Sequence, residues 1–305
     1  MNLLYILSPS YSGSTLLTFM LDQHPEITTI GELKATAMGD IAQYYCSCGE
    51  LITNCSFWRE IKLKCKQNNT PFELDSFGTH FASNNPLWNK IMGAQVRGSF
   101  FEMLRSFCLK NIPSLKSEFQ GVIDQNEKIV DLLMSNKRPG NWFLDGSKDP
   151  NRLKYFLDSS KLPIKVIEMY RDGRAQSHSY CKKYPDEITM ASAAKEWVST
   201  VKQMTIVTQN IPAKEVLRIH YEEMCEDPAR TMRSIWEFLS LPVIDIDWKE
   251  GVSKDTSHIL GNNRMRQSNK VSISIDEDWL NAIAQESLRE FNLVAGTTNR
   301  SLGYK

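Results

Sequence analysis

The chain has 305 residues, of which 41% are hydrophobic and 24% are charged, a composition typical of a globular protein with a sizeable core. Lysine and arginine total 36, and aspartate and glutamate also total 36, so the formal net charge is zero. This balance argues against a generally basic surface, and we expect no nucleic-acid partner.

The apolar N-terminal stretch MNLLYIL lacks a basic region and stops at Ser8. It therefore predicts a first β-strand rather than a signal peptide. No segment approaches the run of about twenty apolar residues that a membrane span needs. We expect a cytoplasmic protein with no membrane partner, and the sequence leaves its oligomeric state open.

The first residues predict a compact βαβ unit. A strand over Leu3–Leu7 precedes a helix from Ser14 to about Gln23, which ends at His24-Pro25 because the residue before proline disfavours the helical region. EITTIGEL supplies a short second strand. A βαβ unit of this kind places its two strands in a parallel sheet.

From Lys34 to Gly140 the pattern is mostly helical. PLWNKIMGAQVRGSFFEMLRSFCLK and LKSEFQGVIDQNEKIVDLLMSN carry apolar residues at three- and four-residue spacing. We interpret the region from about 46 to 140 as a helical insertion over the sheet.

Strands and helices then alternate. NWFLDGSK, LPIKVIEMYR and EVLRIHY predict strands; DPNRLKYFLDSS, DGRAQSHSYCKKY, TMASAAKEWVSTVKQMTIVTQN and DPARTMRSIWEFLSL predict helices. After the polar loop GNNRMRQSNK we expect a last helix from about Asp276 to Phe291. Alternation predicts an open parallel α/β sheet flanked by helices. No linker or repeat interrupts it, so we expect one domain over residues 1–305.

Polar residues follow each predicted strand. Ser12–Thr15 follow the first strand and Glu32 the second, while Lys148, Arg171 and Tyr221 follow the three later ones. The carboxyl ends of parallel strands lie along one edge of the sheet, where ligands bind. This convergence predicts a binding site at that edge.

The segment SPSYSGST runs from strand through a small-residue loop to a helix, an order that presents backbone N–H groups to a phosphate. A nucleoside-triphosphate loop would read G-x-x-x-x-G-K-[ST]. Here Ser8 replaces the first glycine and Ser14 replaces the lysine. These departures argue against a P-loop-type phosphotransferase or kinase, which we keep as an alternative. A catalytically idle nucleotide-binding protein is a further alternative.

The segment YRDGRAQSHSY is the second phosphate signal. Arg171 leaves a buried strand, and Ser179 follows eight residues later, about two helical turns on. A guanidinium and a hydroxyl held in this way can bind a compact phosphate. The alternative is a surface arginine paired with Asp172 or Glu168.

Together these segments resemble the sulfotransferases that use 3′-phosphoadenylyl sulfate (PAPS), especially microbial members and the protein-tyrosine branch. The resemblance rests on SGSTLL, LDQHPEITTIGE, DGSKDPNRLKYFL, YRDGRAQSHS, IHYEEMCEDPARTMRSIWEFL and GNNRMR. It implies a P-loop-like three-layer fold with a central parallel sheet flanked by helices. It also implies transfer of the sulfuryl group from PAPS to a hydroxyl or amine, with release of adenosine 3′,5′-bisphosphate (PAP). We expect a small-molecule acceptor such as a natural product, in a pocket that the insertion builds.

The resemblance assigns the 5′-phosphosulfate to one loop, whose residues are Tyr11, Ser12, Gly13, Ser14, Thr15 and Leu16. The family usually has arginine or lysine where Tyr11 stands. Lys148 or Lys34 would then replace the missing cation, or transfer would be slow, or Tyr11 would stack on a flat or cationic acceptor.

The resemblance implies further binding residues for the other end of the cofactor. Arg171 and Ser179 would hold the 3′-phosphate, and Tyr221 would lie near the adenine or the phosphates. Arg264, in the late basic loop, would close over the 3′-phosphate, with Arg266 as a weaker candidate.

Two residues are candidates for catalysis. Glu32 matches the general base of the protein-tyrosine branch, and a carboxylate at a partly dry edge suits that task. Lys148 would stabilise the leaving phosphate. The alternatives are a glutamate at a helix start and a surface lysine. No metal is required, because fixed cations and N–H dipoles can neutralise the charge that develops.

Three of the seven cysteines crowd together in CSCGELITNCSFW, a segment that also looks like a cysteine cluster of microbial sulfotransferases. Cys46, Cys48 and Cys55 would form a zinc site with Cys65 or His80, a disulfide, or buried free thiols. The usual C-x-x-C pairs are absent, and a reducing cytosol disfavours disulfides. We therefore expect free thiols and no metal.

Overall fold

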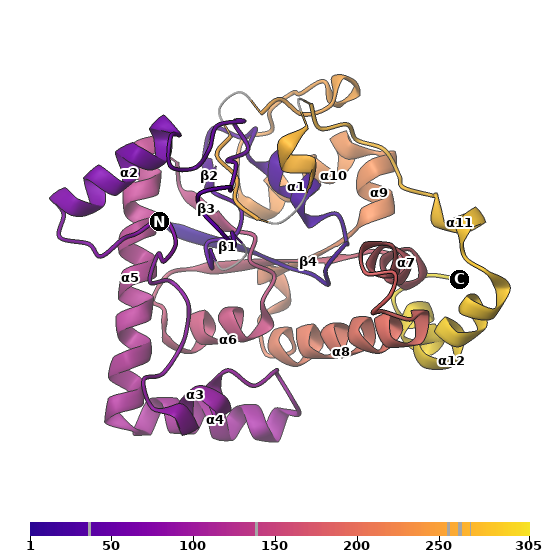
Figure 1. The fold of residues 1–305 in the computed structure, drawn as a ribbon, viewed down its shortest axis with the longest axis horizontal. Helices are drawn as coiled ribbons and strands as arrows, with labels where there is room; N and C mark the ends of the chain where they lie inside the picture. The colour runs from indigo at the N-terminus through magenta and orange to yellow at the C-terminus, as the bar shows by residue number, and fades with distance from the viewer. Residues whose placement is uncertain (36–37, 138–139, 255–256, 262–263, 269) are drawn as a thin grey trace.

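The computed structural model describes residues 1–35, 38–137, 140–254, 257–261, 264–268 and 270–305. A five-stranded sheet in the order β2-β3-β1-β4-β5 forms its centre (Figure 1). All adjacent strand pairs in this sheet are parallel. The strands are β1 (Asn2–Leu7), β2 (Ile27–Thr29), β3 (Trp142–Asp145), β4 (Ile164–Tyr170) and β5 (Val216–His220).

Helices cover both faces of this sheet, so the predicted three-layer α/β architecture is confirmed (Figure 1). The helices of the sheet region are α1 (Ser14–Leu21), α6 (Pro150–Ser159), α7 (Gly173–Lys183), α8 (Met190–Thr208), α9 (Tyr221–Glu226) and α10 (Pro228–Leu239). Among the described residues, no helix is both long enough and apolar enough to cross a membrane.

The central strand β1 shows why this sequence forms a covered parallel sheet. Residues 3–7 are all buried, which is typical of a strand with helices on both faces. Leu4 and Ile6 pack with α1 and α10 on one face, whereas Tyr5 and Leu7 pack with α6 and α8 on the other. The alternation of side chains along a strand divides the core into two layers.

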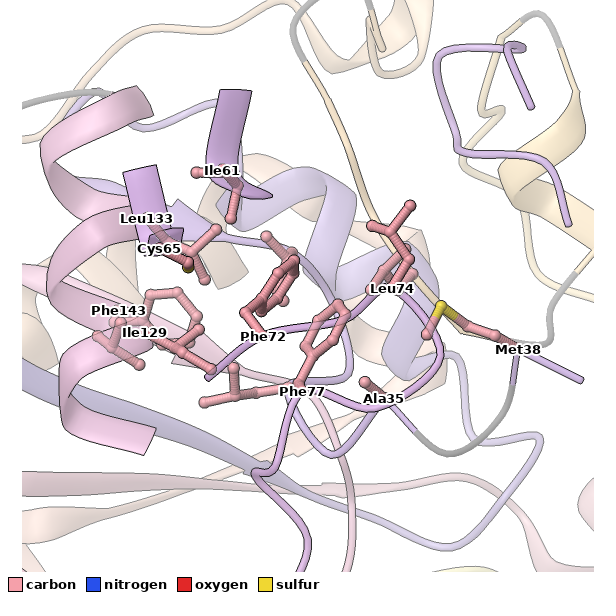
Figure 2. Packing of buried hydrophobic residues seen from close by; sticks show 14 of the residues in the cluster. Ala35, Met38, Ile61, Cys65, Phe72, Leu74, Phe77, Ile129, Leu133 and Phe143 are labelled. Atoms are coloured by element: carbon pink, nitrogen blue, oxygen red, sulfur yellow. The ribbon is translucent and has the colours of Figure 1, made fainter. Parts of the chain in front are cut away.

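The region between β2 and β3 packs as a third apolar cluster against one end of the sheet. Its helices are α2 (Ser56–Gln67), α3 (Pro86–Met92), α4 (Ser99–Asn111) and α5 (Pro113–Lys137). Figure 2 shows Phe72 and Phe77 inserted beside Ile61, Ile129 and Phe143.

The expectation of a mostly helical region is wrong for parts of it. The described residues of 33–55 and residues 68–85 have turns and bridges but no helix, and 93–98 separates α3 from α4. Asn85 caps α3 by accepting from the N–H groups of Leu87 and Trp88, which fixes that helix start. Aromatic residues such as Phe72 and Phe77 are buried from an irregular backbone, so their apolar spacing does not report a helix.

The predicted last helix also differs from the structure. Asp276 lies in an extended segment, α11 covers only Trp279–Ala282, and α12 runs from Gln285 to Ser301, beyond the expected end at Phe291. The helix continues because Phe291, Ala295 and Asn299 form its buried stripe.

A buried ion pair joins the sheet to the region between β2 and β3. Arg152 Nε lies 2.7 Å from Asp145 Oδ2, and their side chains are 2% and 0% exposed. The same guanidinium donates to the Thr79 carbonyl oxygen at 2.6 Å and to the Asn126 side chain. The other Asp145 oxygen accepts from the backbone N–H of Leu33 and of Ser147. Both charges are therefore satisfied, as buried charges must be.

We predict that Arg152→Met lowers the free energy of unfolding by about 3–5 kcal/mol, because it leaves the Asp145 carboxylate buried without its cation. Urea denaturation measures the loss. Lys62→Met, which breaks the exposed Lys62–Glu73 pair, is the control and should cost about 1 kcal/mol or less. Equal small losses in both variants would contradict a central role for the buried pair.

Candidate active site

The loop after β1 has the backbone that an anion site needs. Tyr11 and Gly13 have φ values of 62° and 83°, in the left-handed region. Gly13 caps α1, and the N–H of Leu17 bonds to its carbonyl oxygen at 3.1 Å. The N–H groups of residues 14–16 precede this first helical bond and point out of the helix start. The Ser12 hydroxyl oxygen is buried, and within the described structure it has no hydrogen-bond partner.

Tyr221, at the end of β5, packs against this loop. A Cβ atom added to Gly13 would lie 2.4 Å from Tyr221 Cδ2, so the ring needs glycine there. The Arg171 guanidinium lies over the same ring, 4.7 Å from its centroid. The Tyr221 hydroxyl donates to the Ser274 carbonyl oxygen and accepts from the Asp276 N–H. Tyr221 thus connects the loop, Arg171 and the C-terminal segment.

Arg171 reaches from the end of β4 to the loop. It is 5% exposed and donates to the Tyr11 carbonyl oxygen at 3.1 Å and to Asp276 Oδ2 at 3.0 Å. The alternative partners proposed from the sequence are engaged elsewhere, because Asp172 pairs with Arg174 and Glu168 with Arg218.

Ser179 bonds within its own helix, whereas Asp276 contacts Arg171. The Ser179 hydroxyl donates to the Ala175 carbonyl oxygen on α7. Burial alone would raise the pKa of Asp276, but hydrogen bonding and charge attraction from Arg171 outweigh it and lower that pKa. A carboxylate therefore faces the guanidinium.

Glu32 and Lys148 meet at the neighbouring strand ends, β2 and β3. Lys148 Nζ lies 2.6 Å from Glu32 Oε1, and the side chains are 23% and 21% exposed. Lys148 has a φ of 63°, an uncommon conformation for a residue with a side chain. Such strained residues cluster at functional sites. The structure thus brings together both residues predicted for catalysis.

A second charged pair lies beside the first. Lys34 Nζ donates to Asp149 Oδ2 at 2.5 Å, and the Asp149 backbone joins the Tyr5 hydroxyl. Burial would raise the pKa of Asp149, but the Lys34 ammonium and the backbone N–H groups at the start of α6 outweigh it and lower that pKa.

A cavity of about 190 Å³ opens next to this second pair. Its walls come from the edge of the sheet, α6 and the region between β2 and β3: Lys34, His80, Phe81, Asn89, Met92, Gly93, Asp149, Asn151, Arg152 and Tyr155. Burial and the Lys34 charge lower the pKa of His80. A larger cavity, of about 500 Å³, lies among α4, α6 and α8, and no predicted site residue lines it.

Two predicted residues, Arg266 and Tyr11, have other surroundings. Arg266 is buried and donates to the carbonyl oxygens of Tyr45 and Ile259, so its guanidinium is used in packing. The side chain of Arg264 lies outside the described part of the chain. The Tyr11 ring lies 5.6 Å from that of Tyr180, and burial, together with Tyr184 and Tyr180, raises the pKa of Tyr11 to about 12.

Sequence reasoning missed the acidic partners of this edge. Asp149 precedes Pro150 and accepts from two N–H groups of α6, so the helix-start signal was visible, but its pairing with Lys34 was not. Asp276 lies in a polar stretch without a motif, and nothing in its surroundings along the chain pointed to Arg171.

The parallel sheet, the loop before α1 and the charged groups at one edge define a P-loop-like α/β protein. Residues 98–245 match the model of the sulfotransferase family. Protein-tyrosine sulfotransferase 1 of Danio rerio is 25% identical over 198 residues, which cover 58% of this chain and 52% of that protein. The chain thus spans about half the length of the curated relatives it matches.

Two solved structures share the fold over the whole chain. The sulfotransferase domain of a Synechococcus olefin synthase has a TM-score of 0.55 at 15% identity, covering 100% of this chain and 94% of that domain. The sulfotransferase domain from the curacin biosynthetic pathway has a TM-score of 0.50 at 14% identity, covering 100% and 98%. The resemblance to sulfotransferases is confirmed by the family model and the curated relatives, and the P-loop-like fold by the solved structures.

We predict that Asp149→Asn lowers the free energy of unfolding at pH 7 by about 1 kcal/mol, since asparagine keeps the helix cap but loses the charge beside Lys34. The Asp149 pKa is lowered in the folded state, so its stabilisation is present above the unfolded value of about 4 and is lost as the pH falls through the folded pKa. Denaturation at several pH values should show the two proteins converging in acid. Glu60→Gln, which breaks an exposed pair with Lys64, is the control.

Proposed function

We propose that this protein transfers the sulfuryl group of PAPS to a hydroxyl or amine of a small molecule and releases PAP. The observation that carries the proposal is the connection through Tyr221. Its ring touches Gly13 in the loop on one side and lies under Arg171 on the other. Two separate anion-binding elements are thereby fixed at one edge, as a ligand with phosphates at both ends requires.

The loop is assigned to the phosphosulfate. Residues 12–16 offer N–H groups at a helix start, where the helix dipole also favours an anion. The buried, unpartnered Ser12 hydroxyl adds a group that can donate to the same anion. The position of the kinase lysine is Ser14, which favours a phosphosulfate over a magnesium-bound triphosphate.

Arg171 and Ser179 are assigned to the separate 3′-phosphate. A phosphate bound here would take the place of the Asp276 carboxylate on the guanidinium. Arg264 is assigned to the same phosphate on the family resemblance. Arg266 is a weaker candidate still, since its guanidinium already serves carbonyl oxygens.

Glu32 and Lys148 are assigned to the chemistry. The Glu32 carboxylate takes the proton of the acceptor hydroxyl as the acceptor oxygen forms its bond to sulfur. The bond between sulfur and the bridging phosphate oxygen breaks in line, and the Lys148 ammonium stabilises the charge on that oxygen. The 2.6 Å distance between Lys148 Nζ and Glu32 Oε1 supports this assignment, because it puts a carboxylate and a cation side by side at the edge.

The acceptor is assigned to the cavity of about 190 Å³ beside Lys34 and Asp149. Aromatic walls from Phe81 and Tyr155 and polar groups from Asn89 and Asn151 suit a small molecule with both characters. The related domains of known structure come from a curacin biosynthetic pathway and an olefin synthase. Natural-product alcohols and amines are therefore the first acceptors to screen.

We predict that PAP binds with micromolar affinity and more tightly than ATP with Mg²⁺, and that Arg171→Ala weakens PAP by about 10- to 100-fold through loss of charged hydrogen bonds. Isothermal titration calorimetry measures each affinity. Arg174→Ala is the matched control, since Arg174 lies on α7 but pairs with Asp172. Binding of Mg-ATP without preference for PAP would contradict the sulfotransferase proposal and favour a P-loop-type phosphotransferase or kinase. Binding of neither would favour an idle protein.

We predict that Glu32→Gln lowers kcat by about 10²- to 10⁴-fold and leaves PAP affinity nearly unchanged, because glutamine keeps an oxygen that can accept from Lys148 but cannot take up a proton. Initial rates of PAP release, with an acceptor found by screening, measure the effect. Glu60→Gln, on the exposed face of α2, should keep the full rate. Full activity in the Glu32 variant would overturn its role as base while leaving the transferase assignment in place.

A further inference from the structure

Three cysteine sulfurs and one imidazole nitrogen, none of them among the residues predicted for catalysis or cofactor binding, converge on one point. The Cys3His cluster consists of Cys46, Cys48, Cys55 and His258, whose ligating atoms all lie within 4.8 Å of one another. His258 Nδ1 is 3.5 Å from the sulfur of Cys46 and 3.5 Å from that of Cys55. The sulfurs of Cys48 and Cys55 are 3.7 Å apart.

Three of these separations, two of 3.5 Å and one of 3.7 Å, are close to the edges of a zinc tetrahedron. Bond lengths of about 2.3 Å to sulfur and 2.0–2.1 Å to nitrogen give edges of about 3.8 Å between sulfurs and about 3.6 Å between sulfur and nitrogen. We propose that the Cys3His cluster binds one structural zinc ion. Four protein ligands close the coordination shell, as in structural rather than catalytic zinc sites.

The local structure aims the ligands at one point. Gly49, with a φ of 93°, forms a tight turn in which the Gly49 N–H bonds to the Cys46 carbonyl oxygen. This turn brings Cys46 and Cys48 to the same side, and Cys55 stands at the start of α2. The His258 ring stacks on Phe57 at 4.3 Å with an interplanar angle of 2°, which fixes the direction of Nδ1.

The alternatives explain less of this arrangement. Ordinary core thiols need no imidazole nitrogen; Cys65, for example, packs in the apolar cluster with Ile61 and Phe72. A disulfide requires a sulfur–sulfur distance of about 2.0 Å and would leave a third thiol and the histidine unused. The sequence-based candidates for the fourth ligand are wrong: neither Cys65 nor His80 belongs to the group of converging ligand atoms, and His80 lines the cavity beside Lys34.

The cluster fastens two distant segments of the chain beside Glu32. Next to the ligands, the Ser47 hydroxyl donates to the Ser257 carbonyl oxygen and accepts from the Ile259 N–H. The Tyr44 hydroxyl bonds both the N–H and the carbonyl oxygen of Gly261. A Cβ on Gly261 would lie 3.1 Å from Glu32 Oε1. Zinc would therefore hold the 257–261 segment against the Glu32 carboxylate.

Metal content tests the proposal on the purified full chain. By inductively coupled plasma mass spectrometry we expect one zinc per chain, lost in Cys48→Ser and in His258→Ala. The matched control Cys108→Ser, a thiol on α4 outside the cluster, should keep its zinc. A chelator should lower the melting temperature of the wild type, and added zinc should restore it.

Cobalt exchange of the wild type gives a readout that does not depend on how the variants fold. Co²⁺ in the site should show the intense visible bands of tetrahedral thiolate coordination and a sulfur-to-metal charge-transfer band. Wild type without stoichiometric metal after dialysis against zinc, or a metal content unchanged in His258→Ala, would overturn the proposal. So would a disulfide among the three cysteines, found by peptide mapping of protein purified under reducing conditions.

Discussion

The buried pair of Asp145 and Arg152 is the constraint on which the rest of the edge depends. One carboxylate ends strand β3 and fixes the backbone N–H groups of Leu33 and Ser147. These residues immediately adjoin Glu32 and Lys148, so a fully buried charge sets where the two candidate catalytic groups stand. Through its other hydrogen bonds Arg152 ties the same point to Thr79 and α5. The same ion pair therefore positions both the cavity wall and the two candidate catalytic residues.

Three cations at this edge of the sheet each pair with a carboxylate. Lys148 faces Glu32, Lys34 faces Asp149, and Arg171 faces Asp276. Each cation is oriented by a carboxylate instead of moving freely in solvent. These three pairs are neutral, as the whole chain is, so the anion binding that we propose at this edge would rest on the direction of N–H groups and guanidinium, not on a general positive field.

The sheet was predictable because its determinants are local. Apolar runs such as Leu3–Leu7 and turn residues such as Gly13 mark where strands end, and the ends of parallel strands share an edge. Glu32 and Lys148 could thus be placed together from sequence. His258 and Asp276 could not, because neither lies at the end of a predicted strand or in a periodic segment that would fix its place in the fold. The sequence also predicts helix over residues 68–85, where the structure has irregular backbone that buries Phe72 and Phe77.

The connection made by the Tyr221 ring has a thermodynamic consequence. The elements that it joins come from β1, β4, β5 and the segment before α11, so this part of the edge forms only when segments far apart in the chain have packed together. A ligand that binds there binds the native state alone. Its binding free energy then adds to the stability of the entire fold, and the midpoint of thermal unfolding rises with the logarithm of ligand concentration. The midpoint of thermal unfolding therefore reports what fraction of the protein has a ligand bound at this edge.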